Sequence, residues 1–593
     1  MTADRVRRAA VLLLPVLLVV AGLEARRVAA RALRSFIHYQ TPFGVPPVEA
    51  RTGEPLSRQV VLVLVDGLSL QGSRGLPFLG ELRARGADFD CTIGEPSLSL
   101  PGRAVMLSGA WQEINGQPTN YDPRPLGVDH AFAVARRQGL VTALAADTGG
   151  LRLFAPAIVR PALYAKDPET APFATYEAAQ RRQAQQGEAL VRELHGQPAL
   201  VMIDLHGVDE SGHGWGGASD EYRRAAVQAD DAVRAFAAEM DLDRDTLVVT
   251  ADHGHVAVGG HGGAEEEVLH VPLVLAGAGI RTGARGVARQ IDLAPTLSTL
   301  LGLAIPSSNQ GRPRLDALTL DPGRRVQALR ALLAQRERFV PAYVRTLATL
   351  DDPRAASGGA PAAEGAPVPP AGDEATFAAR LDALDRQEAG AKQERRARER
   401  RARLLPALLL VLAPLALGLL LVRLRIVTGG EMRRALLAAA LAVLLHHLAM
   451  PALGLRYSLT AVNKDEWLPA FFRKDMALGL AVCAIAVAAG AWRARRDHGA
   501  SLFDLARGAW LVTGAFGFAF VVKTAVVYGQ QGAATQWTIA DMRGGVAFYL
   551  DLLVVMAVGI LSPLMALPAW LAALRPVPNT PPAPAAEPAR EVV

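Results

Sequence analysis

The carboxyl-terminal third of the chain consists of long apolar stretches separated by short loops that carry arginines. Each stretch is close to the length that an α-helix needs to cross a bilayer, about 20 residues. Such a series belongs in lipid. We therefore predict an all-α transmembrane bundle of five helices over 404–573, with spans at 404–422, 436–455, 475–492, 508–527 and 546–571.

A further apolar segment at 9–23 follows three arginines near the start of the chain. Signal peptides and uncleaved anchors share this pattern, and the lack of a small-residue cleavage site before Arg26 favours an anchor over 1–35. With a cytoplasmic amino terminus, the arginine-bearing loops after the first and third spans of the bundle lie inside, in agreement with the positive-inside rule. We expect an integral membrane protein whose soluble domain lies on the extracytoplasmic side.

Residues 57–345 alternate between short apolar runs and amphipathic helical periods. The apolar runs have the length and composition of strands and lie at 60–65, 140–145, 199–204, 246–251 and 271–276. Helical periods between them lie at 129–138, 178–194 and 219–239. The alternation predicts an α/β fold, a doubly wound and mostly parallel sheet with functional residues on the loops after its strands.

A stretch rich in Pro, Ala and Gly at 356–375 lies within the predicted linker at 350–403 and cannot bury enough apolar surface to fold. Good helix formers follow at 376–403, so we expect a basic juxtamembrane helix that leads into the membrane. Its arginine cluster at 395–403 fits either a contact with phospholipid or an ordinary solvated helix surface. The tail at 574–593, rich in Pro and Ala, is expected to be disordered.

Charge and cysteine content argue against a nucleic-acid partner and against structures built on cysteine. The 63 Lys and Arg nearly balance the 57 Asp and Glu, and the surplus lies beside the membrane segments, so no nucleic-acid partner is expected. The sequence contains two cysteines, Cys91 and Cys483. A disulfide framework and a thiolate zinc site are therefore ruled out.

Asp and His follow apolar strands or glycine-rich turns in three segments, VLVLVDGL at 61–68, GVDESGHGWG at 207–216 and VVTADHGHVAVGGHGG at 248–263. The carboxyl ends of parallel strands meet at one edge of a sheet, where such side chains can hold a metal ion. Six oxygen and nitrogen donors are too many for one tetrahedral ion. With a nucleophile added they suit two, and the donors are Asp66, Asp209, His213, Asp252, His253 and His261.

The segment EPSLSLPGRAVMLSG at 95–109 supplies the candidate nucleophile. Proline and small residues delay the helix, which places Ser99 just before a helix amino terminus, where its alkoxide gains from the helix dipole. No Ser-His-Asp arrangement or G-x-S-x-G elbow accompanies Ser99. Activation by a metal ion is the remaining way to lower the pKa of its hydroxyl.

These motifs, in this order, resemble those of the alkaline phosphatase superfamily. Within it they are similar to nucleotide pyrophosphatase/phosphodiesterases and to the catalytic domain of GPI ethanolamine phosphate transferases, over about residues 57–305. The resemblance implies two Zn²⁺ ions, in sites that other divalent metals also fit, and it implies that Asn120 binds a phosphate oxygen. The implied ligands are Asp66, Ser99, Asp252 and His253 for one ion and Asp209, His213 and His261 for the other.

The resemblance implies a two-step transfer in which Ser99 attacks phosphorus and a phosphoserine then passes the group to water or to an acceptor hydroxyl. The order of anchor, catalytic domain and helical bundle looks like a shortened GPI ethanolamine phosphate transferase and suggests a membrane lipid or lipid-linked substrate. Three alternatives stay open: a hydrolase of soluble phosphodiesters or monoesters, a serine-type sulfatase and a non-catalytic membrane scaffold. The sulfatase alternative rests on Ser99-Leu-Pro-Gly-Arg103, which fits the S-x-P-x-R pattern.

Other polar residues admit a functional and a structural interpretation. His206, His255 and His270 lie among the candidate ligands, where alternation along strands and turns also places histidines by chance. Arg103 fits a phosphate-facing or a helix-surface position, and the run Glu265–Glu267 is interpreted as a solvated turn. Lys523 and Asp551 form a pair between the last two spans or lie near an interface. The loop at 457–467 either closes the site over a lipid or is a plain connector.

Overall fold

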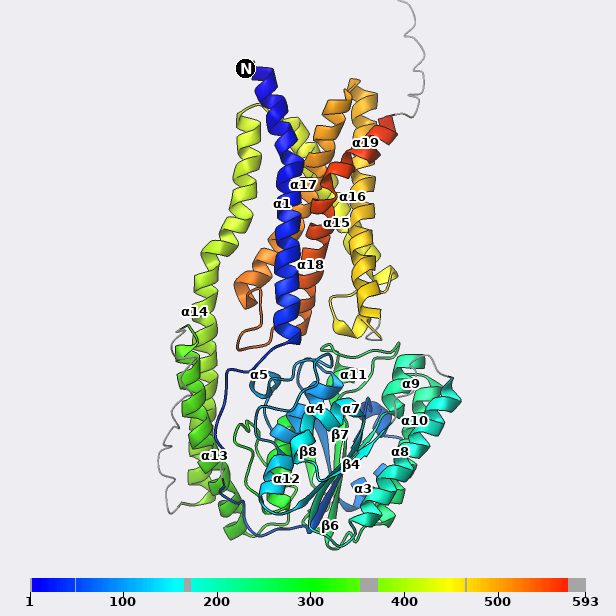
Figure 1. Ribbon diagram of the computed structural model, residues 1–593, viewed down its shortest axis with the longest axis vertical. Coiled ribbons are helices and arrows are strands. Elements are labelled where there is room, and N and C mark those ends of the chain that lie inside the picture. Colours follow the sequence, from blue (N-terminus) through cyan, green and yellow to red (C-terminus); the bar gives the residue numbers. More distant parts are fainter. Residues whose placement is uncertain (1–2, 48, 165–171, 352–371, 464–466, 574–593) are drawn as a thin grey trace, which may run out of the picture.

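The computed structural model describes the chain except residues 1–2, 48, 165–171, 352–371, 464–466 and 574–593. An α/β domain and a bundle of long helices are stacked end to end (Figure 1). The predicted tail and most of the Pro, Ala and Gly-rich linker lie outside the described residues.

One eight-stranded sheet runs through the α/β domain in the order β4-β3-β5-β1-β6-β7-β2-β8. Its pairs are parallel except those of β7, which runs antiparallel to β6 and to β2. This confirms the predicted mostly parallel sheet. The strands are β1 (Gln59–Val65), β2 (Ala87–Thr92), β3 (Val141–Ala146), β4 (Arg160–Leu163), β5 (Ala199–Leu205), β6 (Asp245–Thr250), β7 (His270–Gly277) and β8 (Arg285–Arg289).

Helices cover both faces of the sheet, as a doubly wound fold requires. One group packs together beside β3, β5 and β7 and consists of α3 (Pro77–Arg85), α8 (Phe173–Glu193), α9 (Gly207–Trp215) and α10 (Asp220–Ala238). The other group consists of α4 (Ser99–Ser108), α6 (Ala131–Arg137), α7 (Thr148–Phe154) and α12 (Leu293–Leu300). Short helices α2 (Leu70–Ser73), α5 (Gln112–Asn115) and α11 (Glu266–Leu269) lie in loops.

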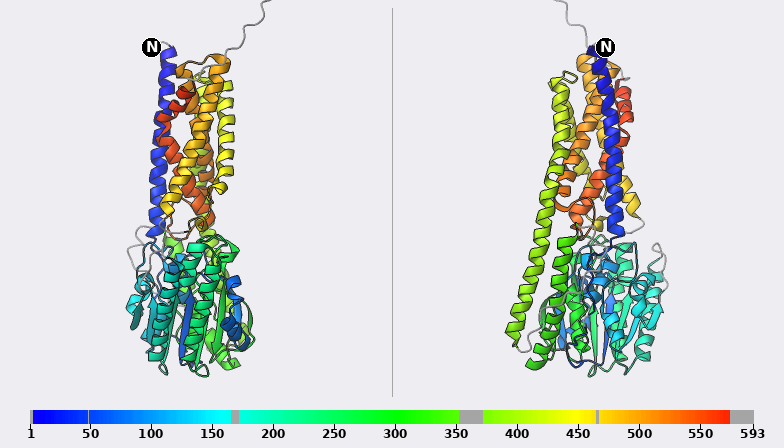
Figure 2. Two further views of the ribbon diagram at one scale, coloured as in Figure 1. Left: turned by 90° about the vertical axis from the view of Figure 1, so that its right-hand side faces the viewer. Right: turned by 60° about the vertical axis from the view of Figure 1, so that its left-hand side comes forward.

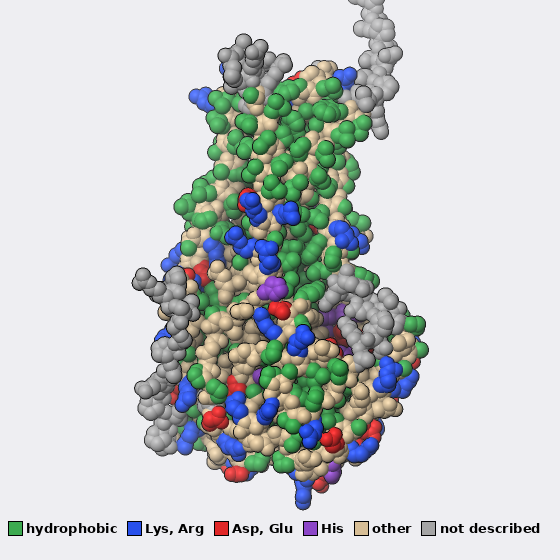
Figure 3. All heavy atoms as spheres, viewed as in Figure 1, with side chains coloured by type: hydrophobic (Ala, Val, Ile, Leu, Met, Phe, Trp, Pro, Cys, Tyr) green, Lys and Arg blue, Asp and Glu red, His purple; other side chains and the backbone are tan. Residues whose placement is uncertain are grey.

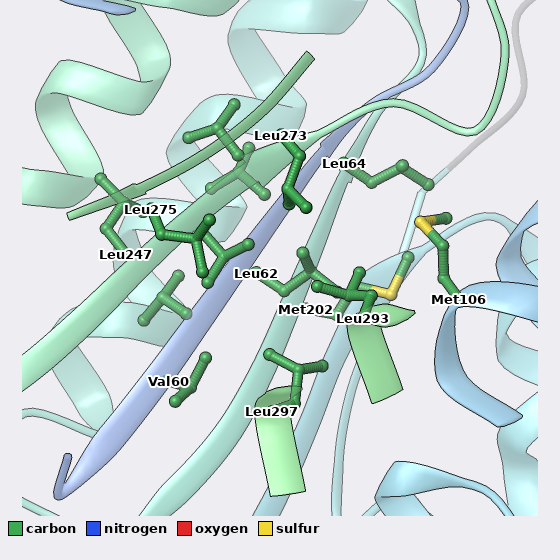
Figure 4. Close-up of a cluster of buried hydrophobic side chains, with 14 of the residues drawn as sticks. Val60, Leu62, Leu64, Met106, Met202, Leu247, Leu273, Leu275, Leu293 and Leu297 are labelled. Atoms are coloured by element: carbon green, nitrogen blue, oxygen red, sulfur yellow. The ribbon is translucent and has the colours of Figure 1, made fainter. Parts of the chain in front are cut away.

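Strand β1 lies in the centre of the core. All seven of its residues are buried, and those after Gln59 are apolar, because a parallel strand with helices on both sides has no face toward water. Leu62 projects toward Met202 of β5 and Leu293 of α12, and Leu64 lies beside Met106 of α4 (Figure 4). Packing in this core fixes the positions at which the central strands end.

Two long helices join the α/β domain to the bundle. Helix α13 (Pro322–Thr349) packs along the first half of α14 (Glu374–Arg423), and α14 continues into the bundle (Figure 2). Helix α14 has 50 residues and is therefore about 75 Å long at 1.5 Å per residue. The predicted juxtamembrane helix and the first predicted span are therefore one helix.

Some arginines of the basic cluster at 395–403 on α14 form ion pairs within the protein. Arg395 is buried and pairs with Asp351 at 2.6 Å and with Glu399 at 2.8 Å, and Arg403 pairs with Glu399 at 2.6 Å. Neither interpretation of the cluster, a phospholipid contact or a solvated surface, fits Arg395. Its guanidinium instead fastens α14 to the end of α13.

Among the described residues, five helices are long and apolar enough to cross a membrane. They are α14, α15 (Gly429–Ala452), α16 (Leu468–His498), α17 (Leu502–Gln531) and α18 (Met542–Ile560). Hydrophobic side chains cover most of this half of the molecule, whereas charged ones gather on the α/β domain and at the junction (Figure 3). The chain is an integral membrane protein.

The prediction of one continuous span at 546–571 is wrong in its last part. Helix α18 ends at Ile560, a 3₁₀ turn follows at Ser562–Met565, and the separate helix α19 covers Ala566–Ala573. Pro563 lies in this turn and has no backbone N–H with which to continue the helix. The apolar composition continues through the break, so hydropathy alone does not reveal it.

Helix α1 (Ala3–Ile37), which contains the predicted anchor, packs along α18. A Cβ atom at Gly559 would lie 2.6 Å from the carbonyl oxygen of Leu18 and 2.8 Å from the Cα of Gly22. Two glycines thus let the backbones of α1 and α18 approach closely, which is a common way for helices to associate in lipid. The described part of α1 belongs to the bundle.

Candidate active site

The central strands β1, β2, β5 and β6 end at the same edge of the sheet. Asp66 directly follows β1, and Asp252 and His253 follow β6. Ser99 is the first residue of α4, the helix after β2, whereas the sequence predicted it just before the helix. Asp209 and His213 lie one turn apart on α9, after β5. The structure thus brings all seven predicted ligands, His261 included, to one edge.

A first cluster surrounds His253. Its Nε2 atom lies 3.4 Å from Asp66 Oδ1, 3.2 Å from Ser99 Oγ and 4.0 Å from Asp252 Oδ2. In the described part of the chain, both of these carboxylate oxygens are buried without a hydrogen-bond partner. Leaving charged oxygens buried and unpaired is costly, and a cation between them would satisfy both. These donors fit a metal ion.

A second cluster lies beside the first. His213 Nε2 is 3.1 Å from His261 Nε2 and 3.4 Å from Asp209 Oδ2, and His261 Nε2 is 3.6 Å from Asp209 Oδ1. Donors bound tetrahedrally to zinc at 2.0–2.1 Å lie about 3.3 Å apart. The two clusters adjoin, since His253 Nε2 lies 4.0 Å from Asp209 Oδ1.

The other ring nitrogens of the three histidines reveal which of their atoms is free to bind a metal. The Nδ1 atom of His253 faces the carbonyl of Gly254, and that of His261 faces the carbonyl of Ser97. In His213 the same atom faces Asn463 Oδ1 at 3.2 Å. Each Nδ1–H donates to an oxygen, which leaves each Nε2 facing the cluster. The three Nε2 atoms are therefore the ones placed to bind a metal ion.

The sequence left open whether His255 has a functional role. In the structure its side chain orients one of the candidate metal ligands. Its Nδ1 accepts a hydrogen bond from the Gly260 backbone N–H at 3.1 Å, so its Nε2–H donates to Asp209 Oδ1 at 2.7 Å. This bond orients the Asp209 carboxylate. A Cβ at Gly212 would lie 2.6 Å from the His255 ring, which explains why the D-x-x-G-H segment has glycine there.

Burial and charge act in opposite directions on the groups of the second cluster. Burial by itself would raise the pKa of Asp209, but the neighbouring His213 outweighs it and holds that pKa well below the usual range. Burial by itself would lower the pKa of His213, but the Asp209 carboxylate raises it to about 9. Without a metal, the two side chains therefore form an ion pair.

Arg103 is buried rather than placed on a helix surface. Its Nη2 atom lies 2.6 Å from Asp66 Oδ2 and 2.9 Å from Asp204 Oδ2, and its Nη1 lies 3.6 Å from Asp147 Oδ1. His206, whose role the sequence also left open, lies 3.5 Å from Asp66. Sequence reasoning missed Asp204, although an aspartate that interrupts the apolar run of β5 was a visible indication.

Ser99 opens into a polar cavity of about 220 Å³ that Asn120 and Arg103 also line. Asn120 Oδ1 accepts a hydrogen bond from the Leu100 backbone N–H at 3.0 Å, which leaves the amide N–H groups of Asn120 to donate to another oxygen. His270 pairs with Asp90 at 2.7 Å, outside both clusters. Asn120 is thus next to the nucleophile, and His270 is not part of the site.

Residues 60–270 match the family of type I phosphodiesterases and nucleotide pyrophosphatases. This match lies within the alkaline phosphatase superfamily and covers most of the α/β domain. The chain is 20% identical over 317 residues to human GPI ethanolamine phosphate transferase 1, covering 44% of this chain and 33% of the relative. It is 33% identical over 129 residues to GPI ethanolamine phosphate transferase 3 of Eremothecium gossypii, covering 19% and 13%. The chain thus spans about a third or less of the length of these relatives.

Among solved structures, the alkaline phosphatase PafA is similar with a TM-score of 0.36 and 12% identity, over 44% of this chain and 99% of that chain.

The loop between α15 and α16 connects the bundle to the candidate site. Ser458 and Thr460 donate to the carboxylate of Glu265 at 2.8 and 2.6 Å, so the interpretation of Glu265 as part of a solvated turn is wrong. Asn463 accepts from His213 Nδ1 and donates to the His213 carbonyl at 2.7 Å. Residues 464–466 of the predicted loop lie outside the described residues. The described part of the loop is more than a connector.

Within the bundle, Lys523 and Asp551 form an ion pair between α17 and α18 at 2.9 Å, which agrees with the first of the two interpretations. The Lys523 ammonium also contacts the hydroxyl of Tyr457 at 2.7 Å and the ring of His447. Tyr457 begins the loop that reaches the site, so this ion pair holds the base of that loop in the bundle.

Proposed function

We propose that the protein is a membrane-bound phosphotransferase or phosphodiesterase of the phosphoethanolamine-transferase kind, which acts on lipid-linked phosphate-ester head groups. One observation carries the proposal: the membrane bundle itself supplies Asn463, which holds the candidate ligand His213. An enzyme for soluble substrates needs no contact between its metal ligands and its membrane helices. The relatives named GPI ethanolamine phosphate transferase support the same substrate class.

The two clusters would hold two zinc ions, with Ser99 as a ligand of the first. When bound, such ions lower the pKa of a coordinated hydroxyl and stabilise the charge that develops on phosphoryl oxygens. The donor sets are Asp66, Ser99, Asp252 and His253 for the first ion and Asp209, His213 and His261 for the second.

In the first step, Ser99 Oγ attacks the phosphorus of the substrate. A bond forms between Oγ and phosphorus, the ester bond to the leaving alcohol breaks, and the proton lost by Ser99 is balanced by the one gained by the leaving oxygen. The amide of Asn120 and the amino terminus of α4 face the phosphoryl oxygens and stabilise their charge. In the second step an acceptor hydroxyl attacks the phosphoserine, gives up its proton and restores Ser99.

The test is trapping of the covalent intermediate. Protein purified in detergent with zinc is mixed with phosphatidylethanolamine that carries a labelled phosphoryl head group, quenched in acid and digested. We expect label on the peptide that contains Ser99, none in Ser99→Ala, and full labelling in Ser108→Ala, which alters the other end of the same helix.

Turnover of the lipid by Ser99→Ala at the wild-type rate would contradict the proposal. Labelled product on an added alcohol identifies a transferase, and labelled phosphoethanolamine in water identifies a hydrolase. A formylglycine at Ser99 in the intact mass, together with turnover of sulfate esters, would instead establish the sulfatase.

A further inference from the structure

A second cavity, of about 170 Å³, lies between the helices of the bundle and the α/β domain. Its walls come from the last turns of α1, the start of α16, the segment after α17 and the start of α18. Most wall residues are apolar, among them Phe36, Phe472 and Tyr549. The cavity therefore offers an apolar environment at the membrane end of the site.

The apolar cavity and the polar cavity of Ser99 meet at two of the candidate metal ligands. His213 and His261 line both. Leu98, which immediately precedes Ser99, also lines the apolar cavity. A molecule that extends from one cavity into the other would place its apolar part among the membrane helices and its polar part beside the nucleophile.

Exposed cationic side chains lie on the turns of α1 and α16 that line the apolar cavity, although they do not line it themselves. Helix α1 carries exposed arginines over its last turns, namely Arg26, Arg27, Arg31 and Arg34, whereas Ala32, Leu33 and Phe36 of the same turns line the cavity. Arg473 and Lys474 are exposed near the start of α16, beside Phe472. Cationic side chains on these turns attract anionic phosphate groups of phospholipids to this level of the bundle.

We propose that the apolar cavity binds the hydrocarbon chain of the phospholipid substrate, whose phosphate ester passes His213 and His261 to reach Ser99. This inference rests on the proposed function and adds where the lipid lies. The lipid reaches the site from the bilayer, between α1, α16 and α18. Because its hydrocarbon chain contacts the apolar cavity, long-chain esters are better substrates than short ones.

Gly545 offers a way to fill the cavity. It lines the wall on α18, and a Cβ there would have its nearest contact, with Ala540 Cβ, at an ordinary 3.6 Å. A leucine side chain at this position would therefore occupy space that the hydrocarbon chain needs. Gly517 on α17 is a matched control, because it has no atom within 4 Å of its Cβ position and does not line the cavity.

The experiment compares wild type, Gly545→Leu and Gly517→Leu with three substrates: dipalmitoyl phosphatidylethanolamine, its dihexanoyl analogue and bis(p-nitrophenyl) phosphate. We expect Gly545→Leu to lower kcat/KM for the dipalmitoyl lipid at least tenfold and to leave bis(p-nitrophenyl) phosphate within twofold of wild type. Gly517→Leu should match wild type throughout. An equal loss on all three substrates, or no loss on any, overturns the inference.

A binding measurement separates the inference from the proposed function. Phosphatidylethanolamine with a photoreactive acyl chain should crosslink to peptides of α1, α16 and α18 in wild type and in Gly517→Leu, and several-fold less in Gly545→Leu. Crosslinking elsewhere, or equally in all three proteins, overturns the inference whatever the turnover. Crosslinking at these helices without any label on Ser99 supports the chain site and contradicts the proposed function.

Discussion

His213 links the metal chemistry of the site to pH. Its pKa is about 9 in the metal-free protein, because the Asp209 carboxylate outweighs the effect of burial. Burial lowers the pKa of His253 and that of His261 below the usual value. At neutral pH, His213 is therefore the ligand of the second cluster that carries a proton, and a metal ion must displace it.

We expect zinc binding to the second site of the metal-free protein at pH 7 to release about one proton, from His213. Because the proton-bound form predominates below pH 9, the apparent affinity of the second site should fall about tenfold per pH unit as the pH decreases from 9. Calorimetry in two buffers that differ in ionisation enthalpy measures the released proton. An affinity that does not change between pH 6 and pH 9 would contradict the pairing of His213 with Asp209.

At the scale of elements, the α15–α16 loop connects the bundle to the metal ligands. It contributes Ser458 and Thr460 to Glu265, and Asn463 to His213. Tyr457 at its beginning is held by the Lys523–Asp551 pair. A shift of the bundle relative to the α/β domain would therefore move the His213 ring, so the loop makes ligand orientation depend on the membrane helices.

Replacing Asn463 by alanine removes the acceptor of the His213 Nδ1–H, and loss of such an outer partner typically lowers metal affinity 10–100-fold. We expect Asn463→Ala to retain the first metal and to lose the second during dialysis against a weak chelator, as measured by elemental analysis. Asn463→Asp is the control, since its carboxylate still accepts from His213. Equal zinc retention in wild type and Asn463→Ala would show that the loop does not position the ligand.

At the scale of the whole molecule, α14 extends from the α/β domain to the opposite end of the bundle (Figure 1). Val287 on β8 of the α/β domain and Leu424 just after α14 are both exposed, at 62% and 54%. The native cysteines Cys91 and Cys483 are buried. Single introduced cysteines can therefore report the orientation of the chain in the membrane.

We expect a membrane-impermeant maleimide to label Val287→Cys on intact cells and to label Leu424→Cys only after lysis. The arginine-bearing loops at the Leu424 end favour the cytoplasm, which places the α/β domain outside. Wild type supplies the background of the two buried thiols. The reverse labelling would place the site in the cytoplasm and would contradict the predicted topology.

The sequence by itself predicted five of the eight strands, the apolar spans apart from the break in the last one, and the strand ends at which the seven candidate ligands lie, because these depend on short-range properties. A short run rich in valine such as VVLVLV is typical of a buried strand, and Asp66 after it lies at the strand end. The three strands that sequence reasoning missed, β2, β4 and β8, lack such a run, since ADFDCT alternates and RPAL and RGVAR are mostly exposed.

Only the tertiary structure decided which side chains the ligands contact. Asn463 lies 250 positions from His213, and no local pattern relates a loop between two membrane spans to a histidine on a soluble helix. The burial of Arg103 and the contacts of Glu265 likewise depend on how separate elements pack. Periodicity is a property of about ten neighbouring residues, whereas the partner of a polar side chain is set by elements that meet only after folding.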